Sequence, residues 1–310
     1  MSYIAVDIGA TNIRVASGNK DGLRHKLSEL TDTGNGPEGV SMQIIRMVEE
    51  LKAVDIQGIG IGSIGPISLS TGEITNTPNY PFNDIPVVKP LTEHFGVKTT
   101  IVNDCAAAVM GEQTFGAGVG LENIVYVTLS TGLGGGAIVD NHLLMGKDGN
   151  AVEVGHITVD ANSRTKCGCG SYGHWEAFCG GKNMPNFART IIHRESWNRS
   201  LIADMTGGDL SRLTSKTVFD AAKQGDEVAK KVVYEVGKIN AVGFANIVNA
   251  YDPELITIGG SIALNNPELV LEPMLQHIDR YLLNRKPEII ITPLGGDIVL
   301  MGALAVAMRK

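Results

Sequence analysis

The stretch "YIAVDIGATNIRVAS", residues 3–17, joins two short aliphatic runs through a turn that contains Gly9 and Asn12. The runs are rich in β-branched residues, which favour strands. Glycine has no Cβ atom, so a glycine in the turn lets the backbone come close to a ligand. We therefore predict two strands hinged at Gly9–Asn12, with Asp7 close to the end of the first.

The same pairing of a strand with glycines recurs along the chain. It appears in "IQGIGIGSIGPIS" (56–68), "NIVYVTLSTGLGGGAIVD" (123–140) and "ELITIGGSI" (254–262). Apolar residues at helical spacing predict helices over 36–54 and 226–251, and the chain ends in a predicted helix over 296–310. Strands that alternate with helices predict an α/β fold.

Composition narrows the class of protein. A chain of 310 residues favours about two domains, and its net charge of −7 argues against a nucleic-acid partner. The start "MSYIAVDIGA" lacks the basic region of a signal peptide, and the longest apolar run, about 298–308, is shorter than the ~18–20 residues that span a bilayer. Four cysteines do not make a secreted disulfide framework. We expect a cytoplasmic protein with no membrane partner.

The glycine-rich turns suggest phosphate binding, because successive backbone N–H groups can form an anion-binding nest. "STGLGGG" (130–136) is neither a Walker A loop nor a dinucleotide-binding G-x-G-x-x-G with its downstream acid. Each turn taken alone is equally consistent with a tight β-hairpin. The recurrence of the pattern after several strands favours phosphate binding.

The segment "TKCGCGSYGHWEAF" (165–178) places two of the four cysteines within three residues, close to His174 and Glu176. Three interpretations are open: a disulfide, a metal-binding knuckle, or a glycine-rich turn that happens to carry thiols.

Taken together, the motifs resemble a known family. "DIGATN" (7–12), "STGLGGG" and "IGGSI" (258–262) look like the phosphate and adenosine loops of the hexokinase–actin superfamily. Four further motifs narrow the resemblance to the ROK sugar kinases: "TPNYP" (77–81), "NDCAAAVMGE" (103–112), "EVGH" (153–156) and "CGCGSYGHWE" (167–176).

The resemblance implies a two-domain α/β fold of the actin/hexokinase (ribonuclease H-like) type with a cleft between the domains. We expect a small domain of residues 1–103 plus 293–310, and a large domain of 104–292 that carries the knuckle. The implied activity is transfer of the γ-phosphoryl group of ATP, with Mg²⁺, to the 6-hydroxyl of a hexose or N-acetylated hexosamine. A homodimer or higher homo-oligomer is implied as well.

The resemblance also implies site residues. Asp104 matches the catalytic base, although aspartate at a strand-to-helix junction is also a good N-cap. The implied sugar-binding residues are Gly65, Asn79, Asn103, Asp104, Glu153, His156 and Glu176. The implied nucleotide-binding residues are Asp7, Gly9, Thr11, Asn12, Thr131, Gly132, Gly259 and Gly260, with Asp7 also handling Mg²⁺. Position 10 is alanine where the family often has glycine.

For the knuckle, the resemblance implies a structural zinc site with one departure. The family motif reads C-x-C-G-x-x-G-C-x-E, and here histidine replaces its last cysteine. Because histidine is also a zinc ligand, we expect the ligands His156, Cys167, Cys169 and His174. Three alternatives stay open: Cys179 or a water replaces His174, the site holds no metal, or Cys105 and Cys179 are plain buried thiols.

Two other functions are alternatives to a kinase. A sugar-responsive ROK transcriptional regulator would carry a winged-helix domain before the first strand, which here already begins near Tyr3. A non-catalytic sugar-binding protein would not need both Asp7 and Asp104. The sugar stays open among glucose, N-acetylmannosamine and N-acetylglucosamine, because "FNDIP" (82–86) departs from the Gly-Trp often seen in glucose-specific members.

Overall fold

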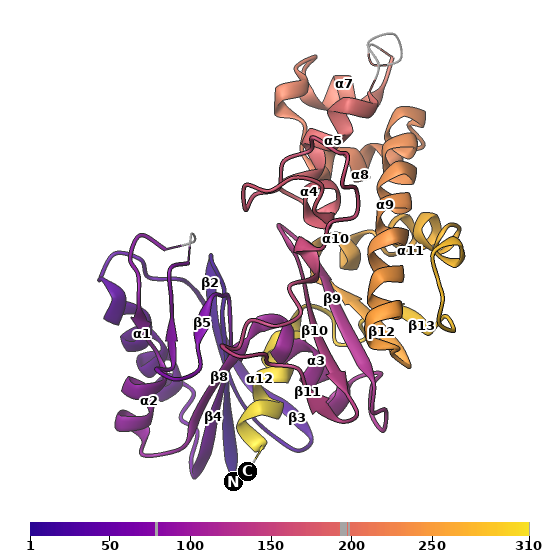
Figure 1. Ribbon diagram of the computed structural model, residues 1–310. Coiled ribbons are helices and arrows are strands. Elements are labelled where there is room, and N and C mark those ends of the chain that lie inside the picture. The colour runs from indigo at the N-terminus through magenta and orange to yellow at the C-terminus, as the bar shows by residue number, and fades with distance from the viewer. Residues whose placement is uncertain (78–79, 193–196, 198, 310) are drawn as a thin grey trace. The chain divides into compact units, whose positions relative to one another are not determined.

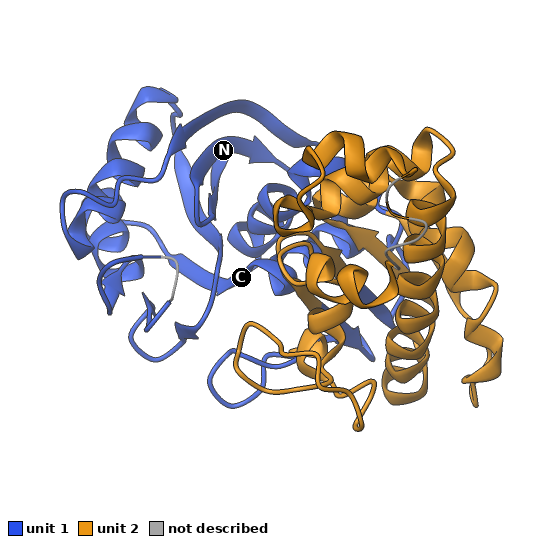
Figure 2. Cartoon of the chain, turned by 90° about the horizontal axis from the view of Figure 1, so that it is seen from above, with its two compact units in different colours: residues 1–126, 136–152, 292–310 blue, residues 127–135, 153–291 orange. Residues whose placement is uncertain are grey.

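The computed structural model describes residues 1–77, 80–192, 197 and 199–309. The chain forms two compact units, unit 1 of residues 1–126, 136–152 and 292–310, and unit 2 of residues 127–135 and 153–291 (Figure 2). The predicted α/β fold in two parts is confirmed. The predicted division at residue 103 stays a prediction, and these units differ from it in grouping 104–126 and 136–152 with the N-terminal strands.

Unit 1 is built on a five-stranded sheet with the order β3-β2-β1-β4-β8 (Figure 1). The strands β1, β2 and β3 form an antiparallel meander, whereas β4 and β8 run parallel to β1. Their bounds are β1 Ser2–Ile8, β2 Asn12–Asn19, β3 Gly22–Leu30, β4 Ile56–Ser63 and β8 Thr99–Asn103.

Helices cover both faces of this sheet, as the alternation of side chains along β1 requires. Ile4, Val6 and Ile8 join a core with residues of α1 (Pro37–Glu50) and with Leu91 of α2 (Val88–Phe95). Ala5 packs on the opposite face against α12 (Ile298–Met308), which lies beside α3 (Asp104–Phe115). The small side chain of Ala5 lets α12 come close to the sheet.

The carboxyl ends of the parallel strands bring predicted site residues to one edge of the sheet. In the ladder registers Ile8 is paired with Ser63, and Ser63 with Asn103. In open α/β sheets ligands bind at this edge. A small antiparallel sheet, also in unit 1, consists of β5 (Ile67–Ser68), β6 (Glu73–Ile74) and β7 (Ile85–Pro86).

A second five-stranded sheet has the order β11-β10-β9-β12-β13. Its strands are β9 Ile124–Leu129, β10 Leu133–Val139, β11 His142–Leu143, β12 Leu255–Gly259 and β13 Glu288–Ile291. The turn between β9 and β10 belongs to unit 2.

Apart from its strands, the described part of unit 2 consists of helices joined by loops (Figure 1). Its helices are α4 Trp175–Cys179, α5 Met184–Ile191, α7 Leu201–Thr206, α8 Ser215–Lys223, α9 Glu227–Tyr251, α10 Gly260–Asn265 and α11 Pro267–Leu275. The described residues also form 3₁₀ turns at η1 Val154–His156, η2 Leu210–Arg212, η3 Ile278–Arg280 and η4 Gly295–Asp297, of which η4 lies in unit 1. None of the helices in the described ranges combines the length and apolar character needed to span a bilayer.

Trp175 anchors the short helix α4 on the long helix α9. Its indole Nε1 donates to Asn240 Oδ1 at 2.8 Å, and its ring meets Phe244 edge to face at 5.0 Å between centroids. Trp175 is fully buried. This anchor fixes the helix that carries Glu176.

Candidate functional site

The turn between β1 and β2 presents polar groups on a rigid backbone. The Gly9 N–H donates to the Asn12 carbonyl at 2.9 Å, and Thr31 Oγ1 donates to the Gly9 carbonyl at 3.1 Å. Thr11 and Asn12 are exposed at the tip. The predicted nucleotide-binding residues of this turn are therefore accessible to a ligand.

Asp7, two residues before Gly9, is held by Arg14. The two residues face each other across the β1–β2 ladder, and Arg14 Nε donates to Asp7 Oδ2 at 2.7 Å. Arg14 Nη2 forms an ion pair with the same oxygen. Burial raises the pKa of Asp7, and the Arg14 guanidinium opposes that shift. Both Arg14 contacts fall on Oδ2, so among the described residues Oδ1 stays available for a cation.

The other nitrogen of Arg14 ties the pair to a further segment of unit 1. Arg14 Nη1 donates to the Gly296 carbonyl at 2.7 Å and lies 3.3 Å from Asp297 Oδ1. Lys26 also binds Asp297. The sequence analysis missed Arg14, although a hairpin hinged at residues 9–12 places residue 14 opposite residue 7.

The junction between β8 and α3 carries the predicted base. Asn103 is the N-cap of α3, and its Oδ1 accepts from the Cys105 N–H at 2.9 Å. Asp104 is the first helical residue, half-buried, and its Oδ1 accepts from the same N–H at 2.7 Å. The capping role weighed for Asp104 thus belongs to Asn103. An acidic group in this first turn is favoured by the helix dipole.

Another predicted sugar-binding position of unit 1, Gly65, lies near this junction. A Cβ atom on Gly65 would stand 3.4 Å from Asn103 Nδ2, so the glycine leaves room beside that amide. Asn79 lies outside the described residues. Its neighbour Tyr80 is buried and donates from its hydroxyl to the Gly9 carbonyl at 2.8 Å, which ties this loop to the β1–β2 turn.

In unit 2, two turns that follow strands lie side by side. Ser130, at the β9–β10 turn, is 3.2 Å from Ser261 at the start of α10, measured between their hydroxyl oxygens. Thr131 is exposed at the first turn. Gly260 has a φ of +84°, and a Cβ there would lie 2.4 Å from the Leu129 carbonyl oxygen. Only glycine fits that position. Because Ser130 and Ser261 lie side by side, the predicted loops Thr131–Gly132 and Gly259–Gly260 form one surface.

A pocket of about 480 Å³ continues from this surface. It is lined by Ser215, Lys216, Phe219, Asp220 and Lys223 of α8 and by Ser261, Ile262, Asn265 and Asn266. Lys216 pairs with Asp220, and Lys223 Nζ donates to the Asn265 carbonyl at 2.8 Å. Only Ser261 and Ile262 of this lining lie in a motif recognised in the sequence, "IGGSI" (258–262).

Glu176 connects the β9–β10 turn to the knuckle. Its Oε2 accepts from the Leu133 N–H at 3.0 Å, beside Gly132. Its Oε1 accepts from the Cys167 thiol at 3.4 Å and from Asn183 Nδ2 at 3.5 Å. The carboxylate therefore holds the β9–β10 turn and the knuckle in one arrangement.

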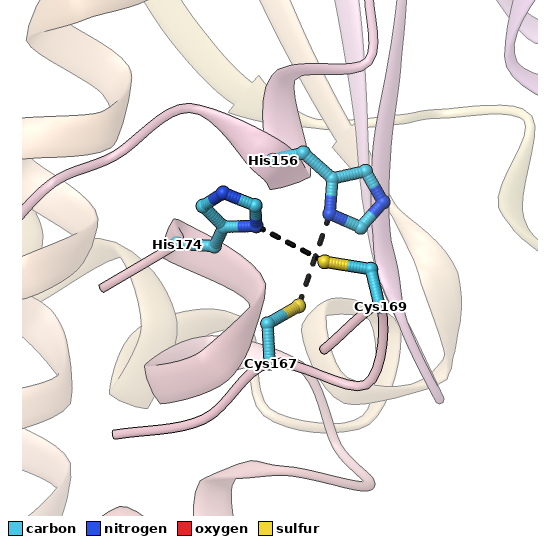
Figure 3. Close-up of side chains that lie close together, drawn as sticks. All are labelled: His156, Cys167, Cys169 and His174. Atoms are coloured by element: carbon cyan, nitrogen blue, oxygen red, sulfur yellow. Dashed lines mark hydrogen bonds between the residues drawn. The ribbon is translucent and has the colours of Figure 1, made fainter. Parts of the chain in front are cut away.

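The four predicted metal ligands come together (Figure 3). His156, Cys167, Cys169 and His174 place their donor atoms within 4.8 Å of one another. Cys169 Sγ is 3.3 Å from His174 Nδ1, and Cys167 Sγ is 3.8 Å from His156 Nδ1. Two sulfurs and two imidazole nitrogens at this spacing suit a tetrahedral zinc ion. Cys105 and Cys179 are both buried, and Cys179 Sγ is 3.7 Å from the Val236 carbonyl.

Burial also affects the protonation of one of the cluster's thiols. Burial, followed by smaller contributions that include the Glu176 carboxylate, raises the pKa of Cys167 to about 12. The thiol therefore keeps its proton at neutral pH unless a cation displaces it.

His156 joins the cluster to Glu153. Nδ1 of His156 faces the thiols, and Nε2 is 3.9 Å from Glu153 Oε2. Burial raises the pKa of Glu153, with His156 opposing the shift and Glu176 adding to it. The side chain of Glu153 is nevertheless 55% exposed, so it is accessible to a ligand.

The chain matches the ROK family over residues 3–310. It is 38% identical over 307 residues to a glucokinase of Pyrobaculum calidifontis, a match that covers 99% of this chain and 95% of that protein. Among solved structures it is similar to a ROK family glucokinase from Streptomyces griseus in complex with glucose and AMPPNP, with a TM-score of 0.82, 29% identity and all of both chains covered. It is also similar to a ROK hexokinase from Thermus thermophilus, with a TM-score of 0.84 and 29% identity over 99% of this chain and 98% of that one.

Proposed function

This chain belongs to the ROK family and is an ATP-dependent sugar kinase, and we propose that it phosphorylates the 6-hydroxyl of glucose. The observation that carries the choice of glucose is the match to a glucokinase over 95% of that protein's length. The same match favours a kinase over a transcriptional regulator or a non-catalytic sugar-binding protein. N-acetylmannosamine and N-acetylglucosamine are the alternative substrates that the assay below compares with glucose.

Asp104 is the proposed base. A sugar hydroxyl is a poor nucleophile until a base takes its proton in the transition state. Asp104 is half-buried at the start of α3, where its carboxylate can accept that proton as the hydroxyl oxygen attacks the γ-phosphorus of ATP. The Nδ2 group of Asn103 can donate to a neighbouring sugar hydroxyl, because only its Oδ1 is used in capping. Gly65 and Asn79 are proposed to complete this side of the sugar site.

The nucleotide is proposed to bind at Thr131–Gly132 and Gly259–Gly260, with its nucleoside in the adjoining pocket of about 480 Å³. Gly9, Thr11 and Asn12 would bind phosphate at the β1–β2 turn. Mg²⁺ when bound neutralises the phosphates. Oδ1 of Asp7 suits that hard cation because Arg14 holds Oδ2 and thereby fixes the carboxylate.

We propose that His156, Cys167, Cys169 and His174 bind one structural zinc ion. Their spacing and the types of their donor atoms support this assignment. The ion would fix His156 and, through the knuckle, Glu176. Those two side chains and Glu153 are the proposed sugar-binding groups of unit 2.

A coupled assay of ADP release over glucose, N-acetylmannosamine and N-acetylglucosamine tests the substrate. We expect glucose to give the highest kcat/KM, and a preference for an N-acetylated sugar would overturn the choice.

Asp104→Asn should lower kcat by on the order of 10²–10⁴ while glucose and nucleotide binding stay near wild type. Asp204→Asn, at an exposed position of α7, is the matched control.

Elemental analysis of protein purified without chelators tests the zinc site, with one zinc per chain expected. His174→Cys should retain the metal, because a thiolate also suits tetrahedral zinc. His174→Ala should lose metal and raise the KM for sugar more than that for ATP. Stoichiometric zinc with unchanged sugar affinity in His174→Ala would contradict the assignment and direct attention to Cys179. Light scattering would test the proposed homodimer or higher oligomer.

A further inference from the structure

The segment between α4 and α5 lies against the proposed phosphate turn. The Gly181 N–H donates to the Ser130 carbonyl at 2.8 Å, and the next N–H, of Lys182, donates to the Thr131 carbonyl at 2.9 Å. These two consecutive backbone hydrogen bonds fix the position of Lys182 beside Thr131.

The same segment touches the lining of the pocket. The place that a Cβ on Gly181 would occupy is 2.7 Å from the Ser130 carbonyl oxygen, 3.0 Å from Ile262 Cδ1 and 3.4 Å from Ser215 Oγ. Ser215 and Ile262 both line the pocket. Lys182 therefore follows a residue that stands between the pocket and the phosphate turn.

The side chain of Lys182 is free to bind a ligand. It is exposed, whereas the next residue, Asn183, is buried and donates to Glu176. No carboxylate in the described part of the chain forms an ion pair with its ammonium group. The two lysines of the pocket differ, because Lys216 pairs with Asp220 and Lys223 donates to a carbonyl.

We propose that the Lys182 ammonium binds the polyphosphate of the nucleotide where it passes from the pocket to the Thr131 turn. A polyphosphate carries several negative charges, and this chain has a net charge of −7, so a local cation is needed to offset repulsion. Lysine suits this role because its flexible stem carries a compact charge with three donors. The inference rests on the proposed nucleotide site, and deepens it by assigning a phosphate ligand.

Calorimetric binding without sugar tests the contact. Lys182→Met keeps most of the stem and removes the charge, so affinities for ADP and AMPPNP should fall roughly 10- to 100-fold, as expected for a charge-assisted hydrogen bond. Adenosine affinity should change less than about threefold, since adenosine carries no phosphate. Lys182→Arg should restore most of the ADP affinity. Lys230→Met, at an ion-paired lysine of α9, is the control and should bind like wild type.

ADP binding by Lys182→Met at wild-type affinity would overturn the proposal. An equal loss for adenosine would overturn it too, because it would show that the substitution disturbs the segment rather than a phosphate contact. Sugar phosphorylation by the wild-type protein is measured separately. A wild type that binds ADP through Lys182 but phosphorylates no sugar would refute the proposed function and support this contact.

Discussion

Val152 is a β-branched residue in a backbone conformation that its side chain disfavours. Its φ is +63°, and its side chain is buried. Most other non-glycine residues with positive φ in the described ranges are Asn or Asp, which tolerate this region. Val152 directly precedes Glu153, where the chain passes from unit 1 to unit 2. Strain of this kind costs on the order of 1–3 kcal/mol and concentrates near functional sites.

The strain at Val152 predicts an inverted order of stability between two variants. At an ordinary position alanine is more stable than glycine by roughly 0.5–1 kcal/mol, whereas at positive φ glycine is the unstrained residue. We expect Val152→Gly to unfold at a higher urea concentration than Val152→Ala. Val154, which is buried two residues later with no positive φ, is the control and should show the usual order. The usual order at both positions would refute the strain.

Tyr80 gives a prediction for alkaline pH. Burial raises the pKa of Tyr80 to about 12, whereas a tyrosine of an unfolded chain has a pKa of about 10. The folded protein therefore holds the proton more tightly. The resulting stability is fully present below pH of about 10 and is lost as the pH rises towards 12. Tyr80→Phe removes the hydrogen bond from the tyrosine hydroxyl to the Gly9 carbonyl. The free energy of unfolding should fall by only about 1 kcal/mol at pH 8, because Thr31 still donates to that carbonyl.

Urea unfolding at several pH values between 8 and 11 would measure this effect. Tyr80→Phe should lose part of the alkaline decline that wild type shows. The rest of the decline persists because burial also raises the pKa values of Tyr251, Cys167 and Cys179. Tyr281→Phe, at an exposed tyrosine, should match wild type, and equal slopes for all three proteins would count against the role of Tyr80.

Site residues could be predicted from the sequence where they lie in a recognisable motif. They could not be predicted where their contacts are with residues distant in the chain. The four residues of the cluster could be found because their residue types are chemically distinctive and three of them lie in one short segment. Lys182 and the pocket residues of α8 carry no local signal, since only folding brings them near the β9–β10 turn and α10.

At the scale of elements, α3 and α12 pack unusually closely through glycine. A Cβ on Gly302 of α12 would stand 1.8 Å from the Ala107 carbonyl oxygen of α3. Helix propensity alone predicts that Gly302→Ala stabilises the protein by about 1 kcal/mol. The overlap is with backbone, which cannot turn aside, so the helices must separate.

We therefore expect Gly302→Ala to destabilise the protein by about 1–3 kcal/mol, as overpacking does. Thermal unfolding followed by circular dichroism measures the change. Gly296→Ala is the control, because a Cβ there meets nothing within 4 Å. A gain of stability in Gly302→Ala would show that the two helices are not held at this distance.

Elements with strong local periodicity were predicted well. The helices expected over 36–54, 226–251 and 296–310 are observed as α1, α9 and α12, with ends that differ by a few residues. The strands expected around each glycine turn are also present. The sequence analysis did not find β3, whose residues Arg24, His25 and Lys26 are exposed and give no apolar signal, or the two-residue strands, which exist only because the fold pairs them.

At the scale of the whole molecule, α12 completes the core of unit 1. Leu300, Ala303 and Leu304 are buried against Ala5 and Ala16 of the first sheet. A chain that ends at Asp297 would leave that face of the sheet bare. We expect such a truncated protein to be largely insoluble or to bind a hydrophobic dye strongly.

A chain that ends at Met308 is the matched control, because it keeps all of α12. It should be as stable as the full chain in the same thermal unfolding experiment. A well-folded protein that ends at Asp297 would contradict the role of α12.

The arrangement of α12 also has a consequence for biosynthesis. Unit 1 contains the first residues of the chain and residues 292–310, whereas unit 2 is complete once residue 291 has been made. During translation all of unit 2 therefore leaves the ribosome before α12, the helix that covers the first sheet. Although N-terminal domains usually fold first during translation, the N-terminal strands here must wait for the last helix. In the nascent chain those strands are the segment that needs protection by chaperones, although they are made first.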